Sequence, residues 1–426
     1  MKCPLFFLPK NSYTKLVKTN EKVGIDMKKK LTKREYIRRK RRRKRIKQIT
    51  FLLSLCFFFC GAVLLVKAIS DKEKNVDAVQ SDVHMPSNTV MGETQSEKPN
   101  EKTNDQNIDD TVITPEPTQE STSGPIQLTI SAAGNCTLGT DENFDQSTSF
   151  NAKYNAVEDP SYFFREVKSA FETDDLTIVN FEGTLTTRGE RKDKTYAFRG
   201  KPEYTAILTS GSVEAVNLAN NHSFDYGNDS YEDTKKYLTE AGIISFGYDR
   251  NAVIDVKGVK VGLIGIYELP YGLESANLLR ENIATVKSEG AQLIIVSFHW
   301  GTEKENYPDS IQKELAHIAI DEGAHLVLGH HPHVLQEIEE YKGRNIVYSL
   351  GNFCFGGNKN PSDKDTMIFQ QTFTITNDVV SEDNVKNIIP CSLSSRSDHN
   401  NYQPMILDGE EKERVMNRIL TYSENL

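Results

Sequence analysis

Cysteine is scarce in this chain of 426 residues, which contains only six. Three of them, Cys136, Cys354 and Cys391, follow the one long apolar run, and they form no CxxC pair. An odd number of cysteines without paired spacing excludes a disulfide framework and a thiolate zinc site as the basis of the fold. No internal repeat is visible either, so nothing in the sequence indicates a repeat array.

Long apolar runs are equally rare, since only residues 49–66 form one without a charged residue. This length is just sufficient for a helix to cross a hydrocarbon core of ~30 Å. Lys and Arg dominate residues 28–47 directly before it, and positive residues stay on the cytoplasmic side. We therefore expect a basic cytoplasmic segment over 1–48, one transmembrane helix over 49–67 and an extracytoplasmic main domain. A cleaved signal peptide and a buried core helix are the alternatives.

The basic run has two interpretations. A cluster of Lys and Arg is also typical of nucleic-acid binding. Its position against the apolar run instead favours a role in topology and attraction to anionic lipid. We expect the cytoplasmic membrane as a partner, and no nucleic acid.

Aromatic residues are absent from residues 71–124, which are rich in Asp, Glu, Ser, Thr, Asn and Pro. Such a segment cannot bury enough apolar surface to offset its ordering entropy. It is predicted to be a disordered acidic linker.

From residue 126 onwards, short apolar runs alternate with helical patterns, which predicts a layered α/β domain. Strands are expected at 126–130, 176–181, 215–218, 259–266, 293–298, 326–328 and 345–349, and helices at 162–171, 203–208, 231–241, 278–288 and 310–322. Residues 367–375 have strand character without a following helix, so the sheets should be mixed. We expect one domain over 125–408 and a helical tail over 409–426.

Polar clusters follow almost every predicted strand, where ligands of α/β sheets gather. The clusters are Gly134-Asn135, Asn180 to Gly183, Asn220-Asn221-His222 with Asp225, His299-Trp300-Gly301 and Gly329 to His333, and they hold five of the nine histidines. Imidazole together with carboxylate suits Zn, Mn or Fe. An extended backbone around Pro332 would aim His331 and His333 at one face and turn His330 away.

The loop Asn217-Leu218-Ala219-Asn220-Asn221-His222-Ser223-Phe224-Asp225-Tyr226-Gly227 resembles the signature loop of the CapA/PgsA family. That family is linked to bacterial poly-γ-glutamate capsule synthesis and is similar in fold to the calcineurin-like metallophosphatases. Four further motifs are similar in the expected order: Asn180 to Gly183, His299 to Glu303, Gly329 to Gln336 and Val347 to Phe353. The resemblance implies a metallophosphatase-like layered α/β sandwich with mixed sheets.

The same resemblance implies a metal site with one or two divalent ions (Mn, Fe or Zn). Its ligands would be Asn135, Glu182, Asn221, His299, His331 and His333, with Glu182 as the bridging carboxylate. His222 would protonate the leaving oxygen, and Asp225 would orient His222. Asn135 is a departure, because the family has Asp there, and an amide contributes no charge to a hard cation.

Three further residues are candidates for substrate binding: Asn220, Trp300 and Asn352. For Trp300, packing beside the site is favoured over contact with substrate, and for Asn352 a turn is an equal alternative. The function that follows is a membrane-anchored extracytoplasmic protein of capsule or poly-γ-glutamate biosynthesis or export. Its partner would be the extracellular anionic polymer or the synthase complex of that polymer. A metal-dependent phosphoesterase acting on an envelope substrate is one alternative, and a non-catalytic scaffold with a degenerate site is another.

Overall fold

The computed structural model describes residues 124–248, 250–383 and 385–423. The predicted cytoplasmic segment, transmembrane helix and most of the linker lie outside these ranges. Within them, no helix combines the length and the apolarity that a bilayer crossing requires.

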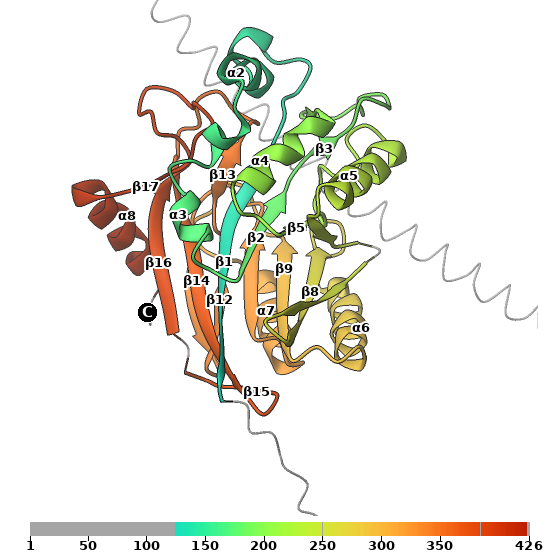
Figure 1. Ribbon diagram of the computed structural model, residues 1–426, viewed down its shortest axis with the longest axis vertical. Helices are drawn as coiled ribbons and strands as arrows, with labels where there is room; N and C mark the ends of the chain where they lie inside the picture. The colour runs from blue at the N-terminus through green and yellow to red at the C-terminus, as the bar shows by residue number, and fades with distance from the viewer. Residues whose placement is uncertain (1–123, 249, 384, 424–426) are drawn as a thin grey trace, which may run out of the picture. The chain divides into compact units, whose positions relative to one another are not determined.

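Two mixed sheets dominate the described chain (Figure 1). The larger sheet has the order β17-β16-β14-β1-β2-β5-β6, with β13 paired to β1 and β15 to β14. Its strands are β1 (Ile126–Thr137), β2 (Leu176–Phe181), β5 (Ala215–Asn217), β6 (Ile244–Phe246), β13 (Asn352–Phe355), β14 (Asp365–Thr376), β15 (Val379–Val380), β16 (Val385–Ser392) and β17 (Met405–Ile406).

The smaller sheet has the order β11-β12-β10-β9-β8-β7. Its strands are β7 (Ala252–Val256), β8 (Val259–Tyr267), β9 (Leu293–His299), β10 (Leu326–His330), β11 (Ile338–Tyr341) and β12 (Arg344–Val347). A separate pair joins β3 (Thr184–Leu185) to β4 (Arg199–Gly200).

Helices cover the outer face of each sheet. The α-helices are α2 (Phe150–Val157), α3 (Lys168–Phe171), α4 (Thr205–Ser210), α5 (Asn228–Glu240), α6 (Ser275–Ser288), α7 (Ser310–Asp321) and α8 (Gly409–Tyr422), and the 3-10 helices are η1 (Gln146–Thr148), η2 (Pro160–Phe163), η3 (Pro202–Tyr204) and η4 (Gly272–Glu274). Helices α2 to α5 share a core with the larger sheet, and α6 and α7 share one with the smaller sheet.

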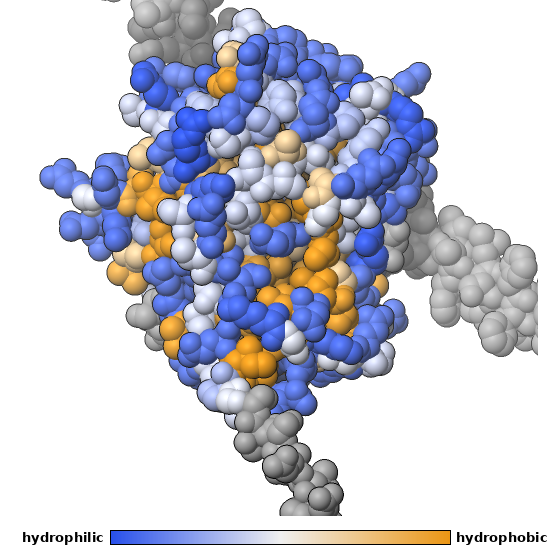
Figure 2. Space-filling view, viewed as in Figure 1, coloured by the Kyte–Doolittle hydropathy of each residue, from blue (hydrophilic) through white to orange (hydrophobic). Residues whose placement is uncertain are grey.

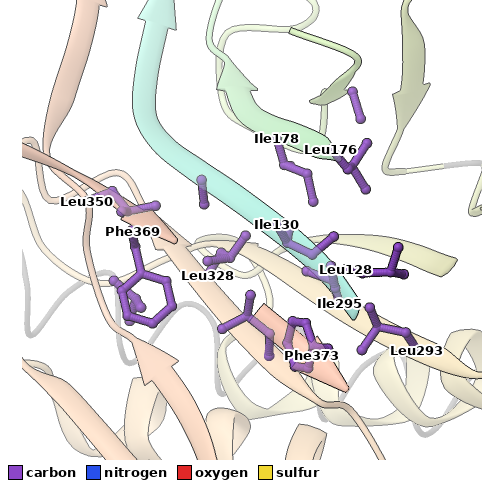
Figure 3. Close-up of a cluster of buried hydrophobic side chains, with 14 of the residues drawn as sticks. Leu128, Ile130, Leu176, Ile178, Leu293, Ile295, Leu328, Leu350, Phe369 and Phe373 are labelled. Carbon is purple, nitrogen blue, oxygen red and sulfur yellow. The ribbon is translucent and has the colours of Figure 1, made fainter. Parts of the chain in front are cut away.

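A third core lies between the two sheets, and strand alternation produces it. Leu293 and Ile295 of β9 belong to the core between the sheets, whereas Ile294 and Val296 pack beneath the helices. This follows from the two-residue period of a strand whose two faces are both covered. Figure 3 shows Leu293 and Ile295 in one hydrophobic cluster with Leu128 and Ile130 of β1. In Figure 2 the surface is largely hydrophilic, and hydrophobic side chains gather below α4.

The parallel strands place their carboxyl ends at one edge of each sheet. Strand β1 runs parallel to β2 and β13, so Asn135 lies beside Asn180 and beside Asn352. In the smaller sheet, β9 and β10 are parallel and His299 lies beside His330. The fold therefore collects the predicted polar clusters at strand ends.

Two differences from the sequence expectations concern the helices. The helix expected at 162–171 is split into η2 and α3, because tertiary packing overrides helix propensity. Phe163 stacks on Phe150, whereas Phe164 packs against Phe353.

The second difference is the tail over 409–426, since α8 joins the domain. Val415 and Ile419 are fully buried in the core between the sheets. Arg418 also binds Asp363 and Asp365, at 2.6 Å each. The packed domain therefore continues to residue 423.

Candidate metal centre

Glu182 lies at the centre of the predicted site, directly after β2. Its side chain is fully buried, and neither carboxylate oxygen has a hydrogen-bond partner among the described residues. The Nε2 atoms of His299, His222 and His333 lie 3.6, 3.9 and 3.9 Å from Glu182 Oε1. A buried carboxylate without a partner is strongly unfavourable, so this arrangement fits a bound cation.

Glu182, His299 and His331 form a candidate ligand group, and their ligand atoms all lie within 4.8 Å of one another. Burial, and then the neighbouring His331, holds the pKa of His299 well below its usual range. Burial and His333 lower the pKa of His331 to about 3. Both imidazoles are therefore neutral at physiological pH, which is the form that binds metal. This group of residues could hold a divalent ion, and the mixture of nitrogen and oxygen donors suits Mn, Fe or Zn.

The turn after β10 aims two of these imidazoles. The backbone is left-handed at His331 (φ 98°) and at His333 (φ 59°), and not extended as predicted around Pro332. A non-glycine residue in this region costs on the order of 1–3 kcal/mol, which persists only where the surroundings hold it. The Lys304 N–H, which donates to the Pro332 carbonyl at 2.8 Å, provides one such restraint. His330 lies outside the ligand group, as expected.

Asn221 and His299 converge on the same point. Asn221 Oδ1 lies 2.8 Å from His299 Nε2. An amide oxygen and an imidazole nitrogen so close together can face one cation next to Glu182. The predicted role of Asn221 as an oxygen ligand is consistent with this position.

Asn135 lies in a chain of four buried asparagines from adjacent strands. The asparagine ladder, as we name it, runs from Asn217 through Asn180 and Asn135 to Asn352. Asn217 Nδ2 donates to Asn180 Oδ1 at 3.0 Å, and Asn180 Nδ2 donates to Asn135 Oδ1 at 2.9 Å. The Asn135 amide nitrogen lies 3.1 Å from His333 Nδ1. The Asn135 oxygen thus already accepts one hydrogen bond, and this side of the site lacks the negative charge of an aspartate.

His222 and Asp225 form a buried hydrogen-bonded pair. His222 Nδ1 donates to Asp225 Oδ2 at 2.6 Å, which leaves Nε2 directed toward Glu182. Asp225 also accepts from Lys194 Nζ at 2.7 Å and from the Phe198 N–H at 2.6 Å. The geometry suits the predicted orienting role of Asp225. The sequence analysis missed Lys194, because an isolated lysine in a loop carries no signal.

The structure separates the three residues predicted to bind substrate. Asn220 is fully buried, donates to the Phe181 carbonyl at 2.8 Å and accepts from the His222 N–H at 3.0 Å. It therefore shapes the loop and does not face a cavity. Trp300 is also fully buried, where it stacks on Phe298 and donates to the Tyr348 carbonyl, so the packing alternative describes it.

Asn352 is different, because it lines a cavity of about 450 Å³ together with His222 and His333. The cavity opens beside the predicted metal ligands. Further lining residues that the sequence analysis did not identify are Phe144, Tyr196, Phe198, Lys304 and Lys359. No sequence pattern groups these residues, because they belong to loops that lie far apart along the chain.

The fold and the site together define an α/β sandwich protein with a candidate divalent-metal centre at the strand ends. A family profile described as "Bacterial capsule synthesis protein PGA_cap" matches residues 129–357, which is just over half of the chain. The chain therefore belongs to this family of bacterial capsule synthesis proteins.

Relatives of known name agree with this assignment. The chain is 33% identical over 220 residues to "Capsule biosynthesis protein CapA" of Bacillus anthracis, which covers 46% of this chain and 54% of that protein. It is 32% identical over 213 residues to "PGA biosynthesis protein CapA" of Bacillus subtilis (strain 168), covering 45% and 56%. The chain thus spans about half the length of these relatives. A hypothetical protein from Thermus thermophilus aligns with 12% identity and a TM-score of 0.39, covering 62% of this chain and 98% of that one.

Proposed function

We propose that this chain takes part in the biosynthesis or export of an extracellular anionic capsule polymer, namely poly-γ-glutamate. Family membership and the printed names of the two Bacillus relatives support the polymer. The basic segment followed by the apolar run supports a membrane-anchored chain with its main domain outside the cytoplasm. The polymer, or the complex that makes it, would be the partner.

The observation that carries a metal-dependent role is the unpartnered carboxylate of Glu182 among imidazoles. A divalent cation bound there would act as a Lewis acid toward an anionic group of the substrate. His299 and His331 would hold the ion with Glu182, and Asn221 would add an oxygen. His333 and Asn135 lie on the side that lacks negative charge, which favours one tightly bound ion over two.

The test combines elemental analysis with polymer output. We expect the purified full-length chain to contain a divalent transition metal, and a Glu182→Gln chain to contain almost none. A strain carrying only the Glu182→Gln chain should produce less capsule polymer than a strain carrying a Glu268→Gln chain, whose altered glutamate is also buried. Wild-type chain without metal, or unchanged capsule in the Glu182→Gln strain, would rule out a metal-dependent role.

A second candidate function is hydrolysis of a phosphoester in the cell envelope, and the His222–Asp225 pair favours it. His222 lies outside the group formed by Glu182, His299 and His331, is oriented by a carboxylate and lines the cavity, as a proton donor to a leaving group requires.

We expect turnover of bis-p-nitrophenyl phosphate by the full-length chain with Mn²⁺, and a loss of about a hundredfold on His222→Ala. The metal content of that variant should be retained. His317→Ala is the matched control, because His317 also bonds a carboxylate (Glu339, 2.8 Å) but does not line the cavity. A chain that holds metal without any turnover would instead be a scaffold.

A further inference from the structure

One wall of the cavity is a cluster of three aromatic rings, which we name the aromatic wall: Phe144, Tyr196 and Phe198. The rings of Tyr196 and Phe198 are almost parallel, with an interplanar angle of 5° and centroids 6.4 Å apart. Phe144 meets both edge-on. Tyr196 is 49% exposed even though it belongs to this cluster. An exposed aromatic ring in a cavity offers a face to a ligand.

The aromatic wall is rigidly attached to the candidate metal centre. The rings of Phe198 and His222 are 4.5 Å apart, and His222 faces Glu182. Two buried carboxylates hold the backbone that carries the wall. The Ala197 N–H donates to Asp141 at 2.7 Å, and the Phe198 N–H donates to Asp225 at 2.6 Å. The wall is thus already in place before a ligand arrives, which reduces the entropy lost on binding.

The charges around the cavity do not suit a chain of carboxylates. Two lysines, Lys304 and Lys359, line it together with three acidic residues, Asp145, Glu303 and Asp363. No excess of positive charge extends along the cavity to attract a polyanion. A divalent ion at the candidate metal centre would stabilise an anionic group strongly.

Hydroxyl and amide groups make up much of the remaining lining. Thr148, Asn358 and Ser362 are examples, and side chains of these types can donate and accept hydrogen bonds. A pyranose ring has the matching chemistry, since its C–H face packs on an aromatic ring and its hydroxyls bond polar side chains around it.

We propose that this cavity binds a hexose phosphate, with the phosphate at the candidate metal centre and the sugar ring against the aromatic wall. The inference depends on the metal centre proposed above and adds the class of substrate. It points to a phosphorylated glycan unit of the envelope as the ligand, in preference to the poly-γ-glutamate chain itself.

The test is calorimetry on the full-length chain with bound Mn²⁺. The two probes are methylphosphonate and the hydrolysis-resistant phosphonate analogue of glucose 1-phosphate, which differ by the sugar. We expect the sugar to tighten binding about tenfold, as one good aromatic contact with its hydrogen bonds provides. Tyr196→Ala should remove that gain and leave methylphosphonate binding unchanged, while Tyr196→Phe should keep it. Tyr271→Ala is the control, because Tyr271 is 59% exposed but does not line the cavity.

The possible outcomes are distinct. Equal affinity for the two probes, or a sugar gain that survives Tyr196→Ala, overturns the proposal. So does tighter binding of a γ-glutamyl tripeptide that Lys304→Ala weakens, which would show a carboxylate chain in the cavity. Failure of the wild-type chain to hold Mn²⁺ at all would instead refute the metal centre on which the inference depends.

Discussion

The two sheets contribute opposite kinds of side chain to the candidate metal centre. The smaller sheet supplies imidazoles, namely His299 from β9 and His331 and His333 from the turn after β10. The larger sheet supplies the asparagine ladder, in which each amide is bonded to the next. Two residues of the larger sheet depart from this pattern: Glu182, which is buried without a hydrogen-bond partner among the described residues, and His222, an imidazole in the loop after β5. One side of the site therefore has its hydrogen bonds within the protein, and the side between Glu182 and the imidazoles could hold a cation.

Glu182→Gln tests this difference most severely. We expect Mn²⁺ affinity to fall more than about a hundredfold, because the carboxylate is the one anionic ligand in the group. The metal-free variant should be more stable than the metal-free wild type by about 1–3 kcal/mol, because an unpaired buried charge is removed. Calorimetric titration and urea unfolding measure the two effects, with Glu268→Gln as control. A variant that keeps its Mn²⁺ affinity would contradict the role of Glu182.

Asn180→Leu changes the other side of the site and should have the opposite effect on the metal-free chain. The substitution removes the bonds that Asn180 makes to the Asn135 oxygen and to the Asn217 amide nitrogen. We therefore expect the free energy of unfolding, measured in urea, to fall by about 2–4 kcal/mol. Asn387→Leu, at an exposed amide on β16, should change stability by less than about 0.5 kcal/mol. If Asn180→Leu were as stable as wild type, the ladder would not be a structural unit.

The sequence predicted this contrast only in part. The β-branched run of β2 and the apolar run of β9 were predicted within a residue at each end, because a strand buried on both faces has a clear pattern. Glu182 and the histidines could then be predicted as site residues, because they directly follow the ends of predicted strands. The sequence could not indicate that the Asn135 oxygen accepts a hydrogen bond from Asn180, since that contact depends on the register of β1 and β2. Nor could it place Asn220 and Trp300 outside the cavity, because both types of residue occur in cores and in sites.

The sheets should also differ in their response to acid, because a partly buried imidazole lies directly before β10 of the smaller sheet. His325 Nδ1 accepts from the Ile294 N–H at 3.0 Å, and burial, followed by Arg344 and Lys287, lowers the pKa of His325 to about 4. In the unfolded chain, His325 binds a proton near pH 6.5. Its contribution to the free energy of unfolding is therefore complete above that pH and is lost as the pH falls to about 4.

Urea unfolding of the metal-free chain at pH 7.5 and at pH 4.5 measures this contribution. The variant His325→Asn keeps an acceptor for the Ile294 N–H. Between the two pH values we expect its free energy of unfolding to fall by about 2 kcal/mol less than that of wild type. All other residues are the same in both chains, so the difference isolates His325. His399→Asn, at an exposed histidine, should follow the wild-type profile. Parallel profiles for wild type and His325→Asn would show that His325 does not respond to pH in this range.

Asn135→Asp would give the larger sheet a second carboxylate at the site, in addition to Glu182. An aspartate keeps an oxygen for the Asn180 amide and directs the other, with its charge, toward His333. Because the number of charged ligands is a main determinant of affinity for hard cations, we expect Mn²⁺ to bind about tenfold more tightly. If a second metal ion binds at the site, elemental analysis should show more metal per chain than in wild type.

Asn217→Asp is the matched control, since it puts the same charge at the far end of the ladder and should not tighten binding. Unchanged affinity and metal content in Asn135→Asp would exclude residue 135 from the coordination of the ion. The asymmetry between the sheets would then come from the ladder as a whole and not from this one missing carboxylate.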